Sequence, residues 1–170
     1  MNWAESAGRV VLEACTPHPQ DVAIVLGWSP VVDELAPHVA EVIVVDPTSN
    51  APLPAKARWL RAPIDQPPDL GRASMVLAHW TWRTLPPGRQ RALARTLGQG
   101  LRERALLVIG DIVWSFPPDS IDEPEQFGDG LEHAPTADAL TAMVRDAGFL
   151  PDLHRFGPAV GVMIALRANR

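Results

Sequence analysis

Two residues, Gly27 and Asp46, stand at the ends of apolar runs, where these residue types serve nucleotide binding. Gly27 follows the run 22–26 (VAIVL), and Asp46 follows the run 41–45 (EVIVV). A strand, helix, strand unit built from these runs places Asp46 at the carboxyl end of its second strand. There its carboxylate can accept hydrogen bonds from two ribose hydroxyls. Aspartate before proline also caps turns, so capping of the sequence DPTS is the alternative role.

The turn after Gly27 continues with Trp28 and Ser29 rather than with further glycines. Glycine allows unusual dihedral angles in such turns and lets the backbone come close to a ligand. Ser29 is small enough to keep part of that approach, whereas Trp28 can either stack on a ligand or seal the sheet edge. We expect the backbone from Leu26 to Ser29, together with Asp46, to hold a ligand if the indole leaves the space beside Gly27 open.

His79 follows the apolar run 74–78 (SMVLA) and is the candidate for proton transfer. A neutral imidazole at a strand end can take a proton from a hydroxyl or an amine, because the unperturbed pKa of histidine is about 6.5. The alternative is a loop histidine that makes one backbone hydrogen bond.

Trp80, Trp82 and Trp114 fall near predicted strand ends. They can form an aromatic wall for a flat or apolar ligand. Packing of the loops over the core is the commoner explanation, and we favour it.

No metal site is expected. Asp111 closes the run 105–109 (ALLVI) with Gly110, and we interpret it as a turn or cap residue because a second acid at metal-binding spacing is missing nearby. The histidines are dispersed, and Cys15 is the single cysteine, so neither a metal cluster nor an internal disulfide is predicted.

The order of the apolar runs predicts an α/β fold with a mostly parallel sheet. Strands are expected over 22–26, 41–45, 57–61, 74–78, 105–109, 150–156 and 160–168, and helices over 3–14, 31–39, 87–101 and the segment between Thr136 and Gly148. Thr136 is a typical N-cap and Gly148 a typical left-handed C-cap. The last two strands are joined by GPA, which is too short for a parallel crossover, so they form an antiparallel hairpin.

The length of 170 residues fits a single domain over 1–170. Within it, residues 1–20 are predicted to form a lead-in helix and a linker. Residues 114–135 form a long loop rich in acids, prolines and glycines, of the length typical of a lid or a binding loop.

The amino-acid composition limits the classes of binding partner that we expect. The net charge of −5 argues against nucleic-acid binding, and we interpret the locally basic segment 83–104 as a helix with a solvated cationic face. No apolar run approaches the length of a membrane span, and the N-terminus lacks the pattern of a signal peptide. We therefore expect a cytoplasmic protein without a membrane partner.

Five strings resemble the class I S-adenosylmethionine-dependent methyltransferases in the right order. They are VAIVLGWSP (22–30), EVIVVD (41–46), ASMVLAHW (73–80), LARTLGQGLRERALLVIGD (93–111) and ALTAMVRDAGF (139–149). The resemblance covers most of the chain. It implies a Rossmann-like, mostly parallel seven-stranded sheet with a C-terminal antiparallel hairpin and helices on both faces.

The resemblance also implies a function, which is methyl transfer from S-adenosylmethionine to a small-molecule acceptor. It makes His79 the catalytic residue facing the acceptor, and it assigns cofactor binding to Leu26, Gly27, Trp28, Ser29, Asp46, Pro47, Pro63 and Ala78. The chain departs from the family in two places. The acid and two glycines of the first turn are missing, and the acid expected after the third strand falls near Pro63, with Asp65 slightly late.

The alternative is a non-catalytic binding or scaffold protein that keeps the methyltransferase fold and has lost the cofactor. Trp28 and the missing glycines favour this alternative, whereas Gly27 and Asp46 favour the enzyme. An NAD(P) enzyme ranks last because G-x-G-x-x-G is absent after the first strand. A homodimer or a partner protein is possible if the apolar run 160–168 lies at a sheet edge.

Overall fold

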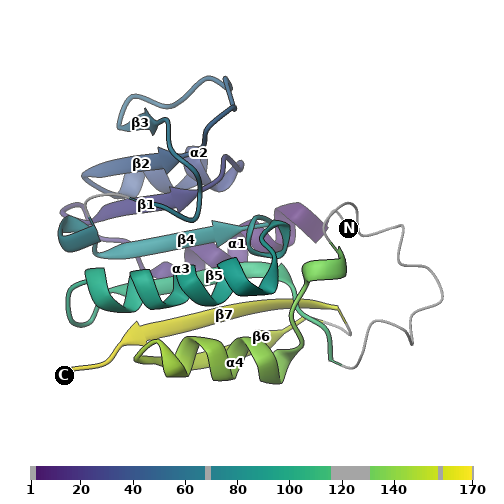
Figure 1. The fold of residues 1–170 in the computed structure, drawn as a ribbon. Helices are drawn as coiled ribbons and strands as arrows, with labels where there is room; N and C mark the ends of the chain where they lie inside the picture. Colours follow the sequence, from purple (N-terminus) through teal and green to yellow (C-terminus); the bar gives the residue numbers. More distant parts are fainter. Residues whose placement is uncertain (1–2, 68–69, 116–130, 157–158, 170) are drawn as a thin grey trace.

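A seven-stranded sheet organises the chain (Figure 1). The computed structural model describes residues 3–67, 70–115, 131–156 and 159–169. The strands are β1 (Val22–Leu26), β2 (Glu41–Val45), β3 (Ala57–Leu60), β4 (Met75–His79), β5 (Leu106–Ile112), β6 (Phe149–Arg155) and β7 (Val160–Arg167). Their order is β3-β2-β1-β4-β5-β7-β6, and β7 runs antiparallel to β5 and β6 while β1 to β5 pair in parallel. The predicted fold class is confirmed.

Helices cover both faces of the sheet (Figure 1). The helices are α1 (Trp3–Cys15), α2 (Val31–Leu35), α3 (Pro87–Gly100) and α4 (Ala137–Asp146). Helices α1 and α2 pack in one hydrophobic core and α3 and α4 in the other, on opposite sides of the sheet. Because both faces of β1, β2 and β4 are covered, their sequences are continuous apolar runs rather than alternating ones.

Most predicted elements lie within one residue of their predicted bounds, and two differ by more. The helix expected over 31–39 ends at Leu35 and tightens into a 3-10 turn, Ala36–His38, because Pro37 has no N–H for an α-helical hydrogen bond. Strand β5 continues to Ile112, three residues beyond its predicted end.

The caps of the last helix are confirmed. The Thr136 hydroxyl accepts a hydrogen bond from the Ala139 amide at 3.2 Å, and Gly148 has a left-handed φ of +88°. The lead-in helix is α1. The long loop predicted over 114–135 falls mostly on residues 116–130, which lie outside the described residues.

The closing strand does not lie at a sheet edge, which was the condition given for its pairing with a second subunit. Strand β7 is inserted between β5 and β6, so it is paired on both sides and buried along most of its length. The edge strand on this side of the sheet is β6, in which buried or partly buried residues alternate with exposed ones over most of its length. The apolar character of β7 therefore reflects its central position in this half of the sheet.

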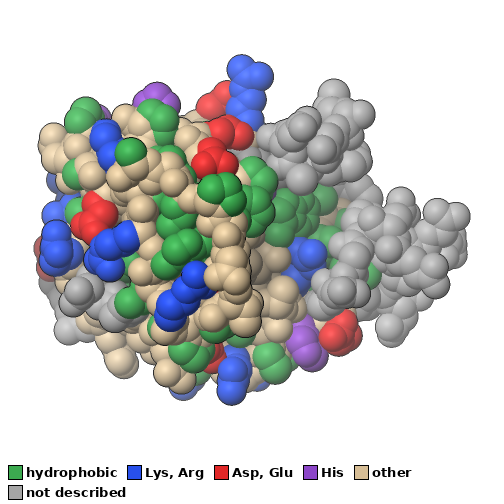
Figure 2. All heavy atoms as spheres, turned by 90° about the horizontal axis from the view of Figure 1, so that it is seen from above, with side chains coloured by type: hydrophobic (Ala, Val, Ile, Leu, Met, Phe, Trp, Pro, Cys, Tyr) green, Lys and Arg blue, Asp and Glu red, His purple; other side chains and the backbone are tan. Residues whose placement is uncertain are grey.

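The charged surface is mixed. Over the described part of the face in Figure 2, Lys and Arg side chains are interspersed with acidic ones rather than gathered into one patch. The absence of nucleic-acid binding remains a prediction from the net charge. Among the helices that the structure describes, none combines the length and apolar character that a membrane crossing requires.

The topology changes direction between β1 and β4. The chain leaves β1 for α2 on one face of the sheet, and it leaves β4 for α3 on the opposite face. We call the carboxyl ends of these two neighbouring strands the switch point. Ligands of open α/β sheets bind at such a position.

At Gly98, α3 packs closely against the end of α4. A Cβ at Gly98 would overlap the backbone carbonyl oxygen of Ala147, which cannot move as a side chain does. Gly98→Ala is therefore expected to lower the free energy of unfolding by about 2 kcal/mol or more. Gly88→Ala in the same helix is the control, because a Cβ there meets nothing within 4 Å. Urea unfolding measures both, and equal stabilities of the two variants would contradict the predicted contact.

Candidate functional site

Asp46 follows β2 and ties two turns together. Its Oδ1 accepts hydrogen bonds from the amides of Thr48 and Ser49, each at 2.8 Å, and its Oδ2 accepts one from the Trp28 amide at 3.1 Å. The capping of DPTS, which the sequence left as an alternative, is therefore real. The contact with Trp28 shows that the carboxylate also holds the turn after β1.

The ionised form of Asp46 is favoured. Burial by itself would raise the pKa of this carboxyl, but the hydrogen bonds from Ser49, Thr48 and Trp28 outweigh burial and lower that pKa. A carboxylate offers about four lone-pair sites. Oδ1 serves the DPTS turn, so Oδ2 is the atom with capacity left for a ligand hydroxyl.

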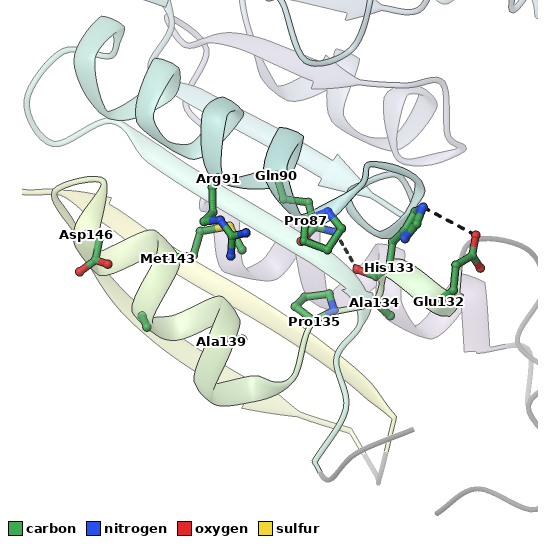
Figure 3. Close-up of a pocket in the computed structure, with 11 residues that line it drawn as sticks. Pro87, Gln90, Arg91, Glu132, His133, Ala134, Pro135, Ala139, Met143 and Asp146 are labelled. Atoms are coloured by element: carbon green, nitrogen blue, oxygen red, sulfur yellow. Dashed lines mark hydrogen bonds and ion pairs between the residues drawn. The ribbon is translucent and has the colours of Figure 1, made fainter. Parts of the chain in front are cut away.

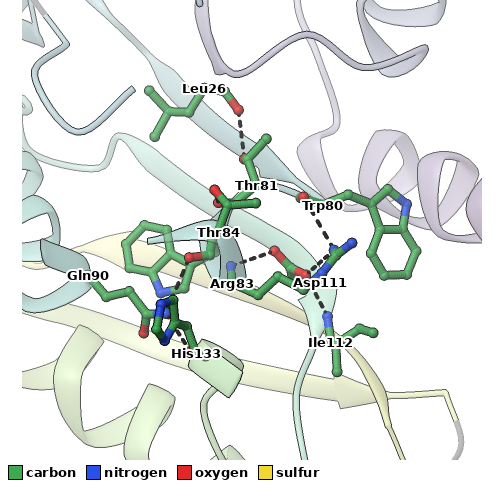
Figure 4. Close-up of polar contacts among 10 residues, drawn as sticks. Leu26, Trp80, Thr81, Arg83, Thr84, Gln90, Asp111, Ile112 and His133 are labelled. Carbon is green, nitrogen blue, oxygen red and sulfur yellow. Dashed lines mark hydrogen bonds and ion pairs between the residues drawn. The ribbon is translucent and has the colours of Figure 1, made fainter. Parts of the chain in front are cut away.

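Gly27 adopts a conformation that its neighbours require. Its φ is +76°, a left-handed value that favours glycine, and its amide donates to the Val45 carbonyl at 2.8 Å. A Cβ at Gly27 would overlap the methyl group of Thr81, from the segment after β4. The hydroxyl of Thr81 donates to the carbonyl of Leu26 at 2.7 Å (Figure 4). Thr81 thus bridges the switch point from β4 to β1.

His79 ends β4 and bridges the switch point a second time. Its Nδ1 lies 3.1 Å from the Ser29 hydroxyl oxygen, and both residues are buried. Burial, with a smaller contribution from the Arg83 guanidinium, lowers the pKa of His79 to about 4. The imidazole is therefore neutral near pH 7. Its Nε2 is buried and has no hydrogen-bond partner among the described residues.

Ala78 and His79 point to opposite faces, as successive strand residues do. The Ala78 side chain belongs to the core beneath α3 and α4, whereas His79 follows Met75 and Leu77, which belong to the core beneath α1 and α2. Only the backbone of Ala78, paired in register with Leu26, is at the switch point.

Two tryptophans flank His79 and Ser29. Trp28 packs partly buried against the core beneath α1 and α2, and Trp80 packs against His79 with ring centroids 5.6 Å apart. Within the described part of the chain, the indole N–H of each is buried without a hydrogen-bond partner. Trp80 also has a left-handed φ of +60°, a strained conformation for a bulky residue.

The aromatic wall is wrong for Trp82 and Trp114. Each is only 1% exposed: Trp82 lies in the core beneath α3 and α4, and Trp114 lies in a small cluster with Ile112 and Ala159. Core packing, the interpretation favoured from the sequence, holds for both.

A buried ion pair fixes the segment after β4. The Arg83 guanidinium donates to Asp111 Oδ1 at 2.9 Å and the Arg83 amide donates to Oδ2 at 3.1 Å, while the Ile112 amide also donates to Oδ1 (Figure 4). Asp111 is 1% exposed, and burial raises its pKa although Arg83 acts in the opposite direction. Asp111 is therefore more than a turn residue. Arg83 lies in the 3-10 turn Trp82–Thr84 before α3, so its assignment to a solvated helix face is wrong.

The proline candidates lie at the periphery. Pro47 and Pro63 are exposed, in the connections after β2 and β3. Arg61 reaches the Asp46 carbonyl at 3.5 Å and so links these connections. Asp65 forms an ion pair with Arg89 of α3 at 3.3 Å, which commits its carboxylate to a different partner.

A cavity of about 350 Å³ lies between α3, α4 and the 3-10 turn Leu131–His133 (Figure 3). None of the residues predicted for the site lines it. Its walls include Pro87, Pro135, Ala139 and Met143. Gln90 is buried beside it and donates to the carbonyls of Trp82, Leu85 and His133. Within the described ranges, no group of three or more His, Cys, Asp or Glu residues is placed to hold a metal ion.

Sequence reasoning missed Thr81, Arg83 and Gln90. One signal could have found Arg83: it and Asp111 are opposite charges at the carboxyl ends of neighbouring strands, which meet at one sheet edge. Thr81 and Gln90 act through backbone carbonyls, and a single sequence does not show which carbonyl a side chain will reach.

No protein-family model and no curated protein matches the sequence. Solved structures match the fold. A 1,6-didemethyltoxoflavin-N1-methyltransferase from Burkholderia thailandensis, solved with 1,6-didemethyltoxoflavin and S-adenosylhomocysteine, gives a TM-score of 0.74 at 15% identity over 99% of this chain and 79% of that chain.

Two further solved structures match the fold of this chain. The N-methyltransferase NodS from Bradyrhizobium japonicum, in complex with S-adenosylhomocysteine, gives a TM-score of 0.74 at 10% identity over 99% of this chain and 89% of that chain. A cyclopropane synthase from Mycobacterium tuberculosis gives a TM-score of 0.71 at 11% identity over 95% of this chain and 83% of that chain. The chain therefore has the fold of class I S-adenosylmethionine-dependent methyltransferases, as the resemblance implied.

His79 is expected to make stability depend on pH. Its pKa falls from 6.5 to about 4 on folding, so the folded state favours the neutral imidazole. The stabilisation is complete above pH 6.5 and is lost as the pH falls towards 4. Between pH 7 and pH 5, wild type should lose about 2 kcal/mol more than His79→Gln in urea unfolding. An NMR titration of His79 with a midpoint near the ordinary value would contradict this prediction.

The Arg83–Asp111 pair is expected to carry far more stability than an exposed pair. Asp111→Asn leaves a nearly buried guanidinium without its anion, which should cost about 3 kcal/mol. The control is Glu13→Gln, which breaks the exposed Arg9–Glu13 pair and should cost less than about 1 kcal/mol. Urea unfolding at pH 7 compares them, and similar losses would show that the buried pair has no special role.

Proposed function

We propose that the protein transfers a methyl group from S-adenosylmethionine to a small-molecule acceptor, with the cofactor at the switch point. The observation that carries the proposal is the contact between Asp46 and the Trp28 amide. It joins the acid after β2 to the turn after β1, in a fold whose solved relatives include methyltransferases holding S-adenosylhomocysteine. Ligand binding at this position is general for open α/β sheets.

The described residues fit the cofactor on the β2 side. Oδ2 of Asp46 retains capacity for a ribose hydroxyl, and Asp46 is partly exposed. The partly buried indole of Trp28 packs against the core beneath α1 and α2. The backbone from Leu26 to Ser29 would line the site. Pro47 and Pro63 would flank it, with the backbone of Ala78 at its floor.

On the acceptor side, His79 has the chemistry for a positioning or proton-accepting role. Its Nδ1 is engaged by Ser29, and its unpartnered Nε2 is buried, so an acceptor would reach Nε2 only after the residues that cover the imidazole move aside. When bound, S-adenosylmethionine supplies the methyl group from its sulfonium and becomes S-adenosylhomocysteine, while the acceptor atom loses a proton. Such displacement depends mainly on alignment, so the low pKa of His79 is compatible with the reaction.

Two features support a small acceptor. The net charge is negative, which disfavours an anionic polymer. The methyltransferase from Burkholderia thailandensis was solved with a small heterocyclic compound, 1,6-didemethyltoxoflavin. A cytoplasmic location is part of this proposal, and the single cysteine supports it.

A second candidate function is a scaffold that has lost the cofactor. The observation that favours it is Thr81, whose methyl group fills the space beside Gly27 that a Cβ would occupy. Calorimetry separates the two functions, because a scaffold gives no heat with S-adenosylhomocysteine.

Binding of S-adenosylhomocysteine is the test of the proposal. Wild type should bind at submillimolar concentration in calorimetry, and Asp46→Asn should weaken the affinity about tenfold, the scale of a hydrogen bond to a charged group. Because Asp46 also holds the turns through Thr48 and Ser49, folding of the variant is checked by circular dichroism.

Asp33→Asn, which alters an exposed carboxylate of α2, is the control and should bind as wild type does. No heat at millimolar ligand from folded wild type would favour the scaffold. An unchanged affinity of Asp46→Asn would remove Asp46 from the site.

A further inference from the structure

Thr81 makes two contacts at the place where a ligand of the switch point would lie. Its hydroxyl donates to the carbonyl of Leu26, the last residue of β1, at 2.7 Å. Its methyl group lies against Gly27, where any side chain would collide with it. A partly exposed side chain from the segment after β4 therefore covers the end of β1.

The Leu26 carbonyl is an acceptor that the fold must satisfy. Backbone carbonyls shielded from water are nearly always hydrogen-bonded, and Leu26 is 1% exposed. Thr81 supplies the donor from within the chain. A bound ligand that carries a hydroxyl or an amine can supply the same donor, so ligand and Thr81 compete for one acceptor.

The backbone around Thr81 is anchored separately from this contact. Arg83 is held by Asp111, and the Thr84 hydroxyl donates to the Thr81 carbonyl at 2.6 Å (Figure 4). Gln90 donates to the carbonyl of Trp82 at 3.2 Å. Loss of the Thr81 side chain therefore leaves the segment in place and exposes the end of β1.

We propose that the Thr81 hydroxyl is an internal competitor that sets the affinity of the switch point for its ligand. The proposal rests on the proposed function, because it takes the ligand to be S-adenosylmethionine or S-adenosylhomocysteine. When the ligand is absent, the Thr81 side chain covers the turn after β1, and its hydroxyl occupies the Leu26 carbonyl. Thr81 then determines affinity without taking part in the methyl transfer.

Calorimetry with S-adenosylhomocysteine tests the competition in three variants, each checked for folding by circular dichroism. Thr81→Ala removes the hydroxyl and should bind about tenfold more tightly than wild type, because the ligand no longer displaces a hydrogen bond. Thr81→Ser keeps the hydroxyl and should stay within about threefold of wild type. The matched control is Thr96→Ala, which removes the hydroxyl of an exposed threonine of α3 away from the switch point and should bind as wild type does.

The outcomes separate this inference from the function on which it rests. Equal binding by wild type and Thr81→Ala overturns the competition and leaves the cofactor site standing. Tightening in Thr81→Ser as large as in Thr81→Ala also overturns it, because the methyl group would then be the obstacle. If neither wild type nor Thr81→Ala binds, the proposed function fails and the competition fails with it. Binding by Thr81→Ala alone supports the competition but favours the scaffold over methyl transfer by the wild-type protein.

Discussion

The site depends on how the polar groups at the switch point between β1 and β4 find their hydrogen-bond partners. The two strands pair in parallel, but the chain leaves them for opposite faces of the sheet, so the polar groups at their ends need partners from elsewhere. In this chain the partners are side chains: Thr81 reaches Leu26, and His79 reaches Ser29. The segment after β4 thereby becomes the cover of the turn after β1.

This arrangement explains how a turn with a single glycine can persist in a methyltransferase fold. Gly27 keeps the left-handed conformation, and Asp46 holds the Trp28 amide, so the geometry of the turn is fixed without further glycines. The strain at Trp80 and the buried Arg83–Asp111 pair lie in the same region. Strained conformations and buried charges gather at functional sites more than elsewhere. They support the view that this edge is built for a ligand.

The fold was predictable because its signals are local and periodic. The runs that became β1 and β2 have the predicted bounds, and Thr136 caps α4 as its residue type indicates. The candidate site was predictable only in part. The position of Asp46 follows from strand ends, whereas the reach of Thr81 to Leu26 depends on tertiary placement. Long-range contacts to backbone carbonyls leave no periodic trace in one sequence, which is why Thr81 was missed.

The most direct test of the central claim is a ¹H–¹⁵N NMR titration of the wild-type protein with S-adenosylhomocysteine. The account predicts that the amide shifts of Gly27, Trp28, Thr48 and Thr81 change together and saturate, because these residues surround the switch point and Asp46. Shifts confined to the cavity between α3 and α4, or unchanged spectra at saturating ligand, would contradict it.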